Sequence, residues 1–273
     1  MSGQGNGLTL RLKAPAGERI NLTCINPASL STLSSHQIAN IKVGMGKFPL
    51  ALGDAFDISG SNGDTITIEG NGAALDFAGA AMESGTLRII GDAGSQAGRK
   101  MTGGRLEVRG NAGNSLGSGM SGGFIHVTGN AGDNIGGMLS GDRFGMTGGI
   151  IVVGGDIGAR AGDKMRRGTI IVKGKTGPGA GSRMIGGTIW AEGGFGADPG
   201  LMMRRGTLIG SKVERLLPTF ADCGKHDLLI IRILNRYLKQ TLGDLAPKPM
   251  PNMVQKIGGD LATIGRGEIL LPG

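Results

Sequence analysis

The chain has 273 residues, 56 of them glycine, a formal net charge of +8 and a hydrophobic content of 39%. Glycine at about three times its usual share suggests low-complexity disorder, but the hydrophobic content is too high for that interpretation, and collagen would need glycine at every third position. The longest apolar run, Leu228 to Ile231, is too short to cross a bilayer, and the N-terminal residues lack the apolar segment of a signal peptide. We therefore expect a folded cytoplasmic protein that does not associate with a membrane.

Residues 1–57 contain strand-like segments, such as Leu8–Lys13 and Ile38–Val43, and lack the repeat that follows them. We expect these residues to form a small N-terminal β cap. A cap is needed because the bare end of a stack of strands exposes unpaired backbone groups and core side chains.

A repeat fills the middle of the chain, and we expect residues 58–210 to form the central domain. Methionine recurs at intervals of 19 residues, with one interval of 26, and a glycine follows each methionine by three residues. The extra residues of the long interval lie within Gly137 to Gly145, where we expect a loop. A fixed period of this kind is typical of a stacked repeat. The methionines are Met82, Met101, Met120, Met146, Met165, Met184 and Met203.

The short runs between the glycines predict β-strands. In Gly85–Gly91 and Gly168–Gly174 the second and fourth inner residues are apolar while their neighbours are mixed, which is the alternation of a strand with one buried face. Nineteen residues with glycine at tight corners suit one coil of a β-solenoid. We expect an all-β fold: a single-stranded right-handed β-solenoid (β-helix) of about seven to eight coils, with methionine as an adaptable filler of the interior.

Residues 211–273 form the third expected domain. Apolar residues recur at helical spacing from Leu228 to Leu242, which predicts a C-terminal α-helix with Asp227 as its N-cap and Gly243 as its end. The proline-rich tail from Ala246 to Asn252 is expected to be an extended linker or arm.

Stacking places equivalent residues of successive coils about 4.8 Å apart, in columns. The middle residue of each predicted strand faces outward, and along the chain these residues change from polar to apolar. A contiguous apolar surface is usually covered by another element. Either the C-terminal helix or a partner protein could cover this surface. Trp190 is the expected anchor residue in either case. This apolar stripe consists of Ile150, Val152, Ile171, Trp190 and Ile209.

Positive charge is concentrated in the second half of the repeat, where residues 143–210 carry a net charge of +6. Basic residues recur at the same corners of the coils, with one pair of positions on adjacent coils and two arginine pairs two coils apart, and stacked like charges repel one another. An anion or an acidic protein surface would relieve this repulsion; a solvated basic face is the alternative. Nucleic acid is not expected, since the aromatic side chains that stack on bases are missing. This basic column comprises Lys164, Arg166, Arg167, Arg183, Arg204 and Arg205.

No catalytic or metal-binding residue stands out in the sequence. Cys24 and Cys223 are too far apart for a metal or redox motif, and each is expected to be a lone buried thiol. The three histidines lack the spacing of metal ligands. Gly117–Gly122 and Gly168–Thr176 nearly match nucleotide-binding motifs but fail in spacing or in the element that should follow. We expect no active site, no metal and no cofactor on this chain alone.

The repeat, Met-x-x-Gly followed by Gly-x-x-Gly-x-x-x-Gly, resembles the glycine-rich β-helix shared by the C-terminal domain of glutamate synthase and the C subunit of formylmethanofuran dehydrogenase. The flanking segments are more similar to the second family. Phe48–Gly60 precedes the repeat, and Leu216–Gly224 follows it and leads into an apolar helix. The resemblance covers residues 40–273.

This resemblance implies a non-catalytic structural subunit of a one-carbon complex. The hydrolytic version transfers formyl from formyl-tetrahydromethanopterin to a methanofuran-type carrier and hydrolyses the product to formate. Its partners are an amidohydrolase-like A subunit with zinc, a B subunit and a formyltransferase D subunit. The redox version reduces CO2 with a molybdenum or tungsten pterin and iron–sulfur clusters in other subunits. Abundant arginine, alanine and glycine favour a bacterial, hydrolytic complex.

The resemblance also suggests a use for the basic column, because methanofuran-type carriers have an anionic, glutamate-containing tail. We hypothesise that the column holds this tail while the formyl-bearing end moves between active sites. An acidic patch on a neighbouring subunit is the competing occupant. For the chain as a whole, a glutamate synthase-type β-helix domain and a free structural solenoid are the other interpretations.

Overall fold

The secondary structure falls into three groups along the chain. A computed structural model describes residues 7–13, 19–45, 50–70 and 73–273. The N-terminal group is β1 (Leu8–Leu12), β2 (Ile20–Asn21), α1 (Pro27–Leu30), α2 (Ser35–Ala39), α3 (Leu52–Ala55) and β3 (Phe56–Gly60). The central group is β4 (Thr65–Glu69), β5 (Leu75–Asp76), β6 (Thr86–Ile90), β7 (Arg105–Arg109), β8 (Phe124–Val127), β9 (Ile150–Val153), β10 (Thr169–Val172), β11 (Thr188–Ala191) and β12 (Arg205–Gly210). The C-terminal group is β13 (Ala221–Asp227), α4 (Leu229–Leu242), a 3-10 turn (Gly243–Leu245), β14 (Met253–Gly259) and β15 (Arg266–Pro272).

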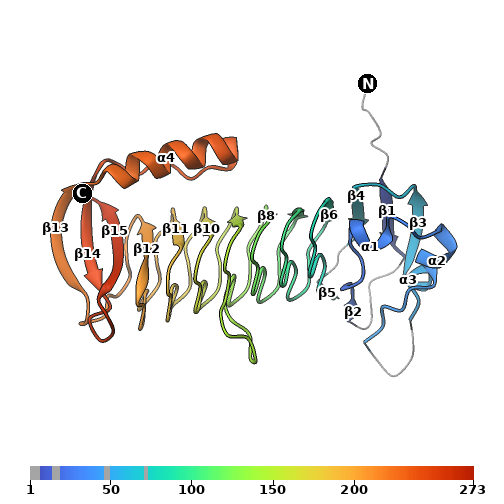
Figure 1. The fold of residues 1–273 in the computed structure, drawn as a ribbon, viewed down its shortest axis with the longest axis horizontal. Helices are drawn as coiled ribbons and strands as arrows, with labels where there is room; N and C mark the ends of the chain where they lie inside the picture. The colour runs from blue at the N-terminus through green and yellow to red at the C-terminus, as the bar shows by residue number, and fades with distance from the viewer. Residues whose placement is uncertain (1–6, 14–18, 46–49, 71–72) are drawn as a thin grey trace.

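The strands gather into one elongated stack. Within the described residues one open sheet has 13 strands, in the order β13-β14-β15-β12-β11-β10-β9-β8-β7-β6-β4-β1-β3, and β2 pairs with β5 separately. Figure 1 shows the strands from β6 to β12 as a row of parallel arrows between the N-terminal elements and the C-terminal strands. The fold is therefore mostly sheet and β-helix-like.

The register of the sheet follows the sequence repeat. Leu87 lies opposite Leu106, and Leu106 lies opposite Ile125, so equivalent residues of successive repeats are neighbours. A second line of contacts joins the same repeats at another side of the stack, through parallel bridges that link Ala93, Ala112, Ala131, Ile157, Thr176, Phe195 and Val213 in turn. Stacking at two sides turns a period in sequence into columns in space.

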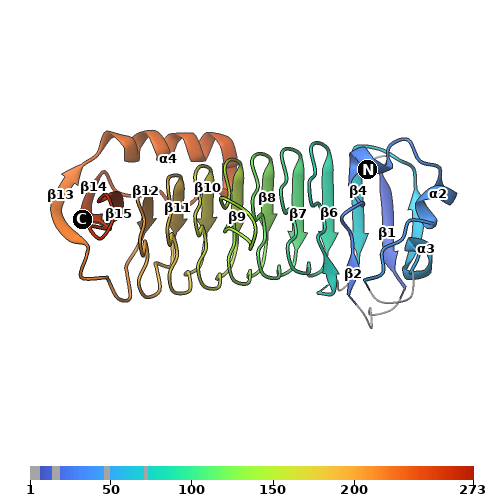
Figure 2. The same ribbon diagram turned by 60° about the horizontal axis from the view of Figure 1, so that its bottom comes forward.

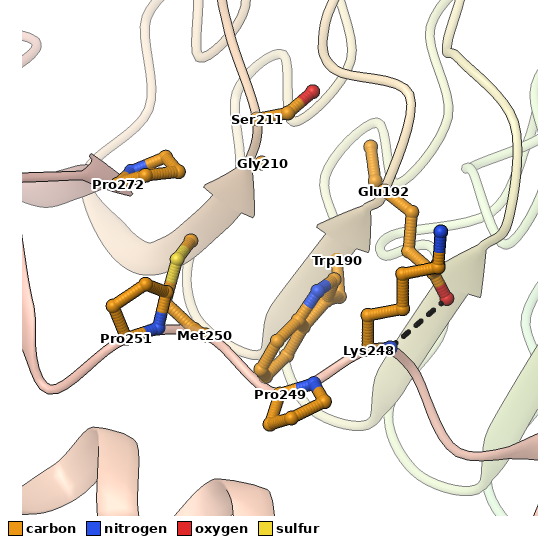
Figure 3. Close-up of a pocket in the computed structure, with 10 residues that line it drawn as sticks. Trp190, Glu192, Gly210, Ser211, Lys248, Pro249, Met250, Pro251 and Pro272 are labelled. Atoms are coloured by element: carbon orange, nitrogen blue, oxygen red, sulfur yellow. Dashed lines mark hydrogen bonds between the residues drawn. The ribbon is translucent and has the colours of Figure 1, made fainter.

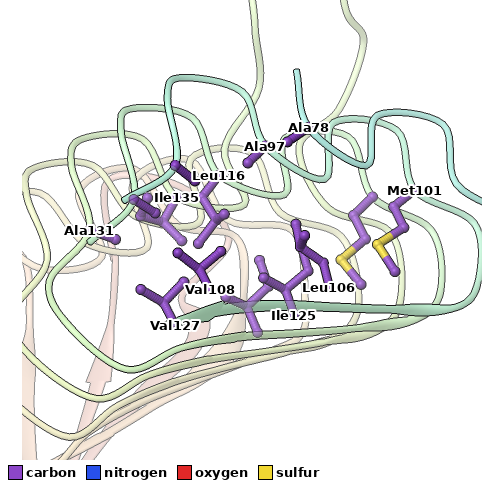
Figure 4. Close-up of a cluster of buried hydrophobic side chains, with 14 of the residues drawn as sticks. Ala78, Ala97, Met101, Leu106, Val108, Leu116, Ile125, Val127, Ala131 and Ile135 are labelled. Atoms are coloured by element: carbon purple, nitrogen blue, oxygen red, sulfur yellow. The ribbon is translucent and has the colours of Figure 1, made fainter. Parts of the chain in front are cut away.

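The interior is filled by residues that face inward from each repeat. The seven methionines of the repeat are all fully buried, which confirms that they fill the interior. Figure 4 shows Met101, Leu106 and Ile125 directed into the same enclosed space as Leu116 and Ile135. Alternating strand residues and the corner methionines thus build one continuous apolar core.

Glycine is required at the corners for two different reasons. At Gly122 a Cβ atom would lie 2.2 Å from the carbonyl oxygen of Thr102 in the neighbouring repeat, closer than real Cβ atoms approach backbone. At Gly117 the backbone has φ +63, which favours glycine, and a Cβ would lie 2.5 Å from Ile151 Cδ1. The excess of glycine therefore reflects tight corners in an ordered stack.

Asparagine and aspartate side chains form ladders along the outside of the corners. In each rung a side-chain oxygen accepts a hydrogen bond from the backbone N–H of the next repeat. Asn130 Oδ1 accepts from the Asp156 amide at 2.8 Å, and Asp156 Oδ1 accepts from the Lys175 amide at 2.8 Å. In a second ladder, Asp133 Oδ1 accepts from the Ala159 amide at 2.8 Å. The ladders satisfy backbone donors that the short strands leave unpaired.

Replacing Asp133 by alanine should lower the free energy of unfolding by about 1 kcal/mol, because the Ala159 amide loses its acceptor. Asp133→Asn keeps an Oδ1 acceptor, as Asn114 does in the preceding rung, and should stay within about 0.5 kcal/mol of the wild type. Urea unfolding of the two variants measures the difference. Equal losses in both variants would show that the negative charge, rather than the hydrogen bond, is what matters at this position.

The longest interval of the repeat forms the expected loop. Residues 137–145 extend from one corner of the stack, visible as the green segment that projects below β8 in Figure 1. Asp142 of the loop pairs with Lys100, with Nζ and Oδ1 3.0 Å apart. This ion pair holds the loop against an earlier repeat.

The N-terminal segment contains both strands and short helices. β1 lies between β3, to which it is antiparallel, and β4, to which it is parallel, so it joins the segment directly to the stack. α1, α2 and α3 lie beside these strands (Figure 1). Phe48 and Pro49, the first residues of the segment that carried the family resemblance, lie outside the described residues.

The C-terminal segment differs from the prediction in two ways. The helix is present, but Leu228 is its N-cap and makes no side-chain cap hydrogen bond, whereas Asp227 is the last residue of β13. The expected arm, Ala246 to Asn252, contains no helix or strand, but the residues beyond it form two strands that were not predicted, β14 and β15, and β15 pairs in parallel with β12. The chain thus returns to add a further strand to the stack. No helix within the described ranges has the length and apolar character needed to cross a bilayer.

Candidate functional site

The apolar stripe lies inside the chain's own fold. Ile150 is partly buried, and the other four residues of the stripe are almost completely buried. Figures 1 and 2 both show α4 lying lengthwise beside the strands that carry the stripe. The covering side chains come from α4 and from the segment that returns after it, and they are Ile231, Leu238, Leu242, Met250, Val254 and Leu270.

A small cavity remains where the returning segment crosses Trp190. It has a volume of about 170 Å³ and is lined by Trp190, Met250 and three prolines (Figure 3). At its edge the Lys248 amide donates to Glu192 Oε1 at 3.2 Å, and Lys173 Nζ lies 2.8 Å from the same oxygen. These contacts fasten the returning segment to the stack, and the cavity offers no pair of groups suited to acid–base chemistry.

The basic column is positioned by the buried methionines. Arg166 and Arg204 each follow a methionine whose side chain is fully buried. Their backbone amides donate to the carbonyl oxygens of Met146 and Met184, at 2.9 and 2.7 Å. Because the methionine points inward, the next two residues lie on the surface, and Arg166, Arg167, Arg204 and Arg205 are all exposed. Among the described residues, none of the four has a carboxylate within ion-pair distance.

Lys164 and Arg183 form a separate part of the basic column. Both occupy a corner position with positive φ, at 51 and 54 degrees. Arg183 forms a bidentate pair with Asp163, whose side chain is only 3% exposed and also accepts from Arg160. The hydrogen bond that Arg183 donates to the Asp163 carboxylate holds the pKa of Arg183 above its ordinary value. The charge of Arg183 is therefore already compensated within the chain, unlike that of the four exposed arginines.

The loop at residues 137–145 reaches the basic column through Phe144. The guanidinium of Arg166 lies 5.1 Å from the centre of the Phe144 ring, and that of Arg143 lies 5.0 Å from it. Contacts of this length are within the range of cation–π interactions. The loop therefore brings a further cation, Arg143, beside the exposed end of the column.

The structure adds one basic residue that sequence reasoning missed. In the β12–β15 pairing, Arg266 lies directly opposite Arg205, and its side chain is exposed. The sequence contained a signal for it, since Arg266–Leu270 (RGEIL) matches Arg205–Ile209 (RGTLI) in pattern. The exposed arginine column thus comprises Arg166, Arg167, Arg204, Arg205 and Arg266.

A second group of charged side chains lies on β6, β7 and β8. Glu107 accepts hydrogen bonds from Arg88 and Arg105. Burial alone would raise the pKa of Glu107, but these hydrogen bonds and charges outweigh burial and hold that pKa below its ordinary value. Desolvation lowers the pKa of the neighbouring His126. The cluster is an ion-pair network in which Glu107 is shared by Arg88 and Arg105.

The described part of the chain contains no group of three or more His, Cys, Asp or Glu side chains arranged to hold a metal ion. Cys24 and Cys223 are both exposed, so the expectation that each is a buried thiol was wrong. Cys24 follows β2 and Cys223 lies in β13, whose residues all face solvent. The exposed arginine column is therefore the strongest candidate for a binding site.

Comparisons with known proteins agree on one family. No model of a protein family matches the chain. The C subunit of the formyltransferase/hydrolase complex Fhc from Methylorubrum extorquens is 42% identical over 65 residues, so the chain spans about a quarter of the length of that curated relative. A chain of the crystal structure of the formyltransferase/hydrolase complex (FhcABCD) from the same organism, in complex with methylofuran, is 40% identical, with a TM-score of 0.90. That match covers 97% of this chain and 99% of the other.

Proposed function

Because this chain belongs to the family of the C subunit of the formyltransferase/hydrolase complex, we propose that it is the non-catalytic structural subunit of such a complex. The observation that carries the proposal is the match at 40% identity over 97% of the chain to a chain of the FhcABCD structure. The complex transfers formyl from formyl-tetrahydromethanopterin to a methanofuran-type carrier and hydrolyses the product to formate.

The partners are the A, B and D subunits of the same complex. We propose that this chain positions an amidohydrolase-like A subunit, which would hold zinc, relative to a formyltransferase D subunit. The long, continuous core of the stack supports this role, since a stiff element of this kind can hold two catalytic subunits at a fixed separation. We also propose that the stack is a right-handed β-helix of seven to eight coils. Its domains would be residues 1–57, 58–210 and 211–273, and the protein would be cytoplasmic.

We propose that the exposed arginine column binds the anionic tail of the carrier. Exposed cations without a carboxylate partner in the chain favour an external anion, and the related complex was crystallised with methylofuran. Arg205 and Arg266 lie on adjacent strands, about 4.8 Å apart along the stack, and Arg167 lies two levels from Arg205. A flexible anionic tail that spans two levels of the stack would contact both Arg167 and Arg205.

Co-purification tests the structural role. The native chain, isolated under mild conditions, should carry the A, B and D subunits with it, as identified by mass spectrometry. Formyl transfer and hydrolysis should both be lost when the chain is omitted from a reconstituted complex. Recovery of a glutaminase or a flavin-dependent synthase domain would instead favour the glutamate synthase-type interpretation, and a stable free monomer would favour an isolated solenoid.

A further inference from the structure

α4 is apolar on two opposite sides. Its inner side is buried against the stack through Ile231, Leu238 and Leu242. Its outer side carries large apolar residues that remain exposed, by 65%, 52% and 50% respectively for Leu229, Ile233 and Tyr237. The apolar surface of α4 therefore extends beyond the side that the stack covers, and exposed apolar patches of this kind mark interaction sites. The outer side therefore indicates a surface that another element covers in the assembled protein.

The outer apolar residues are arranged as a ridge. Leu229, Ile233 and Tyr237 recur every four residues, so they lie in one row along the helix surface. Together with Arg232, Arg236 and Gln240 they line a groove of about 460 Å³. Rows of this spacing are the ridges that pack into the grooves of another helix. The geometry therefore suits a helix better than an irregular segment.

A row of cations runs beside this ridge, on one side of it. Arg232, Arg236 and Lys239 line a second groove of about 660 Å³ between α4 and the returning proline-rich segment. Arg232 pairs with Asp227 near the start of the helix, and Lys239 lies 3.7 Å from Asp244 beyond its end. For Arg236, in the middle of the row, no carboxylate of the described residues lies within ion-pair distance. The chain itself thus leaves the centre of the row uncompensated.

We propose that the outer side of α4 docks a helix of a neighbouring subunit, with an apolar stripe at four-residue spacing and Asp or Glu along one flank. This proposal rests on the proposed function, which supplies the neighbouring subunits. The apolar stripe of the partner packs against Leu229, Ile233 and Tyr237, and its acidic flank faces Arg232, Arg236 and Lys239. Desolvated aromatic and arginine residues at the centre of an interface are typical contributors to affinity.

Two other occupants fit the surface less well. A second copy of the chain would present its own α4, and that helix contains no acidic residue to compensate Arg236. The anionic tail of a carrier would compensate the cations but would leave the ridge of Leu229, Ile233 and Tyr237 exposed to water. A helix with an apolar stripe and an acidic flank would bury the apolar ridge and compensate the row of cations at the same time.

Assembly of the complex with α4 variants tests the proposal. Ile233→Asp places a carboxylate in the centre of the ridge and should weaken binding of the chain to the other subunits at least tenfold, as measured by titration and gel filtration. Arg236→Glu should weaken it in the same direction, whereas Arg236→Lys should largely retain it. Leu261→Asp is the matched control, because Leu261 is a large apolar residue that is 61% exposed and lies outside α4.

Each outcome of this experiment has a defined meaning. If Ile233→Asp and Arg236→Glu assemble like the wild type, the docking proposal is overturned while the proposed function stands. If the wild-type chain fails to assemble with the A, B and D subunits, both are overturned. Thermal unfolding of the isolated variants controls for folding, and Arg236→Glu decides alone if Ile233→Asp unfolds. A photo-crosslinking residue at Tyr237 should join to a helix of another subunit; a crosslink to a second copy would contradict the proposal.

Discussion

Replacing Arg166, Arg167, Arg204 and Arg205 together by serine should raise the KM of the assembled complex for its methanofuran-type carrier about fourfold or more. Each exposed charge contact contributes roughly 0.2–1 kcal/mol, and the four side chains have no ion-pair partner among the described residues. The KM should also depend less on salt concentration, because screening acts on the contacts that are removed. Steady-state kinetics at several ionic strengths measure both effects. Adding Arg266→Ser should raise the KM further.

The control for this experiment changes the same amount of charge elsewhere. Arg109, Lys175, Lys212 and Lys225 are exposed and lie outside the exposed arginine column, and their joint replacement by serine should leave the KM close to that of the wild type. An unchanged KM in the arginine variant, with the complex intact, would contradict tail binding. Loss of subunits from the arginine variant on gel filtration would assign the column to an acidic patch of a neighbouring subunit instead.

Trp190→Ala should destabilise the chain by about 3–5 kcal/mol, the usual range for removing a buried tryptophan. Trp190 is 2% exposed. It lies between Ile171 and Ile209 in the sheet register and beneath the returning segment. Because the lost contacts join α4 and the returning segment to the stack, amide hydrogen exchange in α4 should accelerate more than exchange in β6 and β7. Thermal unfolding and hydrogen exchange with mass spectrometry measure the two effects.

Trp190→Phe is the control for this second experiment, since it keeps a buried aromatic ring and should cost clearly less than Trp190→Ala. Equal destabilisation by the two variants would show that the indole makes a specific contact that phenylalanine cannot replace. Uniform acceleration of exchange along the whole stack would show that the C-terminal cover and the repeats unfold as a single unit.

The repeat was predictable because its determinants are local. Inward strand residues such as Leu106 and Ile125, the buried methionine of each unit and glycine at the corners all recur with the same period. Stacked repeats contact mainly their neighbours, so the register follows from the period without knowledge of distant parts of the chain. The exposure of Arg166 and Arg204 follows in the same way, because each comes directly after a buried methionine.

The C-terminal segment was less predictable because its contacts are distant in sequence. Asp227 matched the pattern of an N-cap, yet pairing of β13 with β14 placed it at the end of a strand. β15 joins the stack beside β12, although some sixty residues separate Arg205 from Arg266. The sequence left the cover of the apolar stripe open between the helix and a partner, since hydrophobicity shows that a surface is covered but does not identify what covers it.

The amino-acid sequence by itself determined the stack, its period, its interior and the rows of charge and apolar residues on its surface, since these depend on spacing within a short repeat. Only the tertiary structure decided which parts of this surface are covered by other segments, which charges are paired within the chain and which remain exposed. It placed α4 and the returning segment over Val152, Ile171 and Trp190, and it compensated Arg183 through Asp163 while leaving other arginines exposed. It also added Arg266 to the column. These outcomes depend on where a non-repeating chain segment returns, and contacts between distant residues, rather than a local period, control that path.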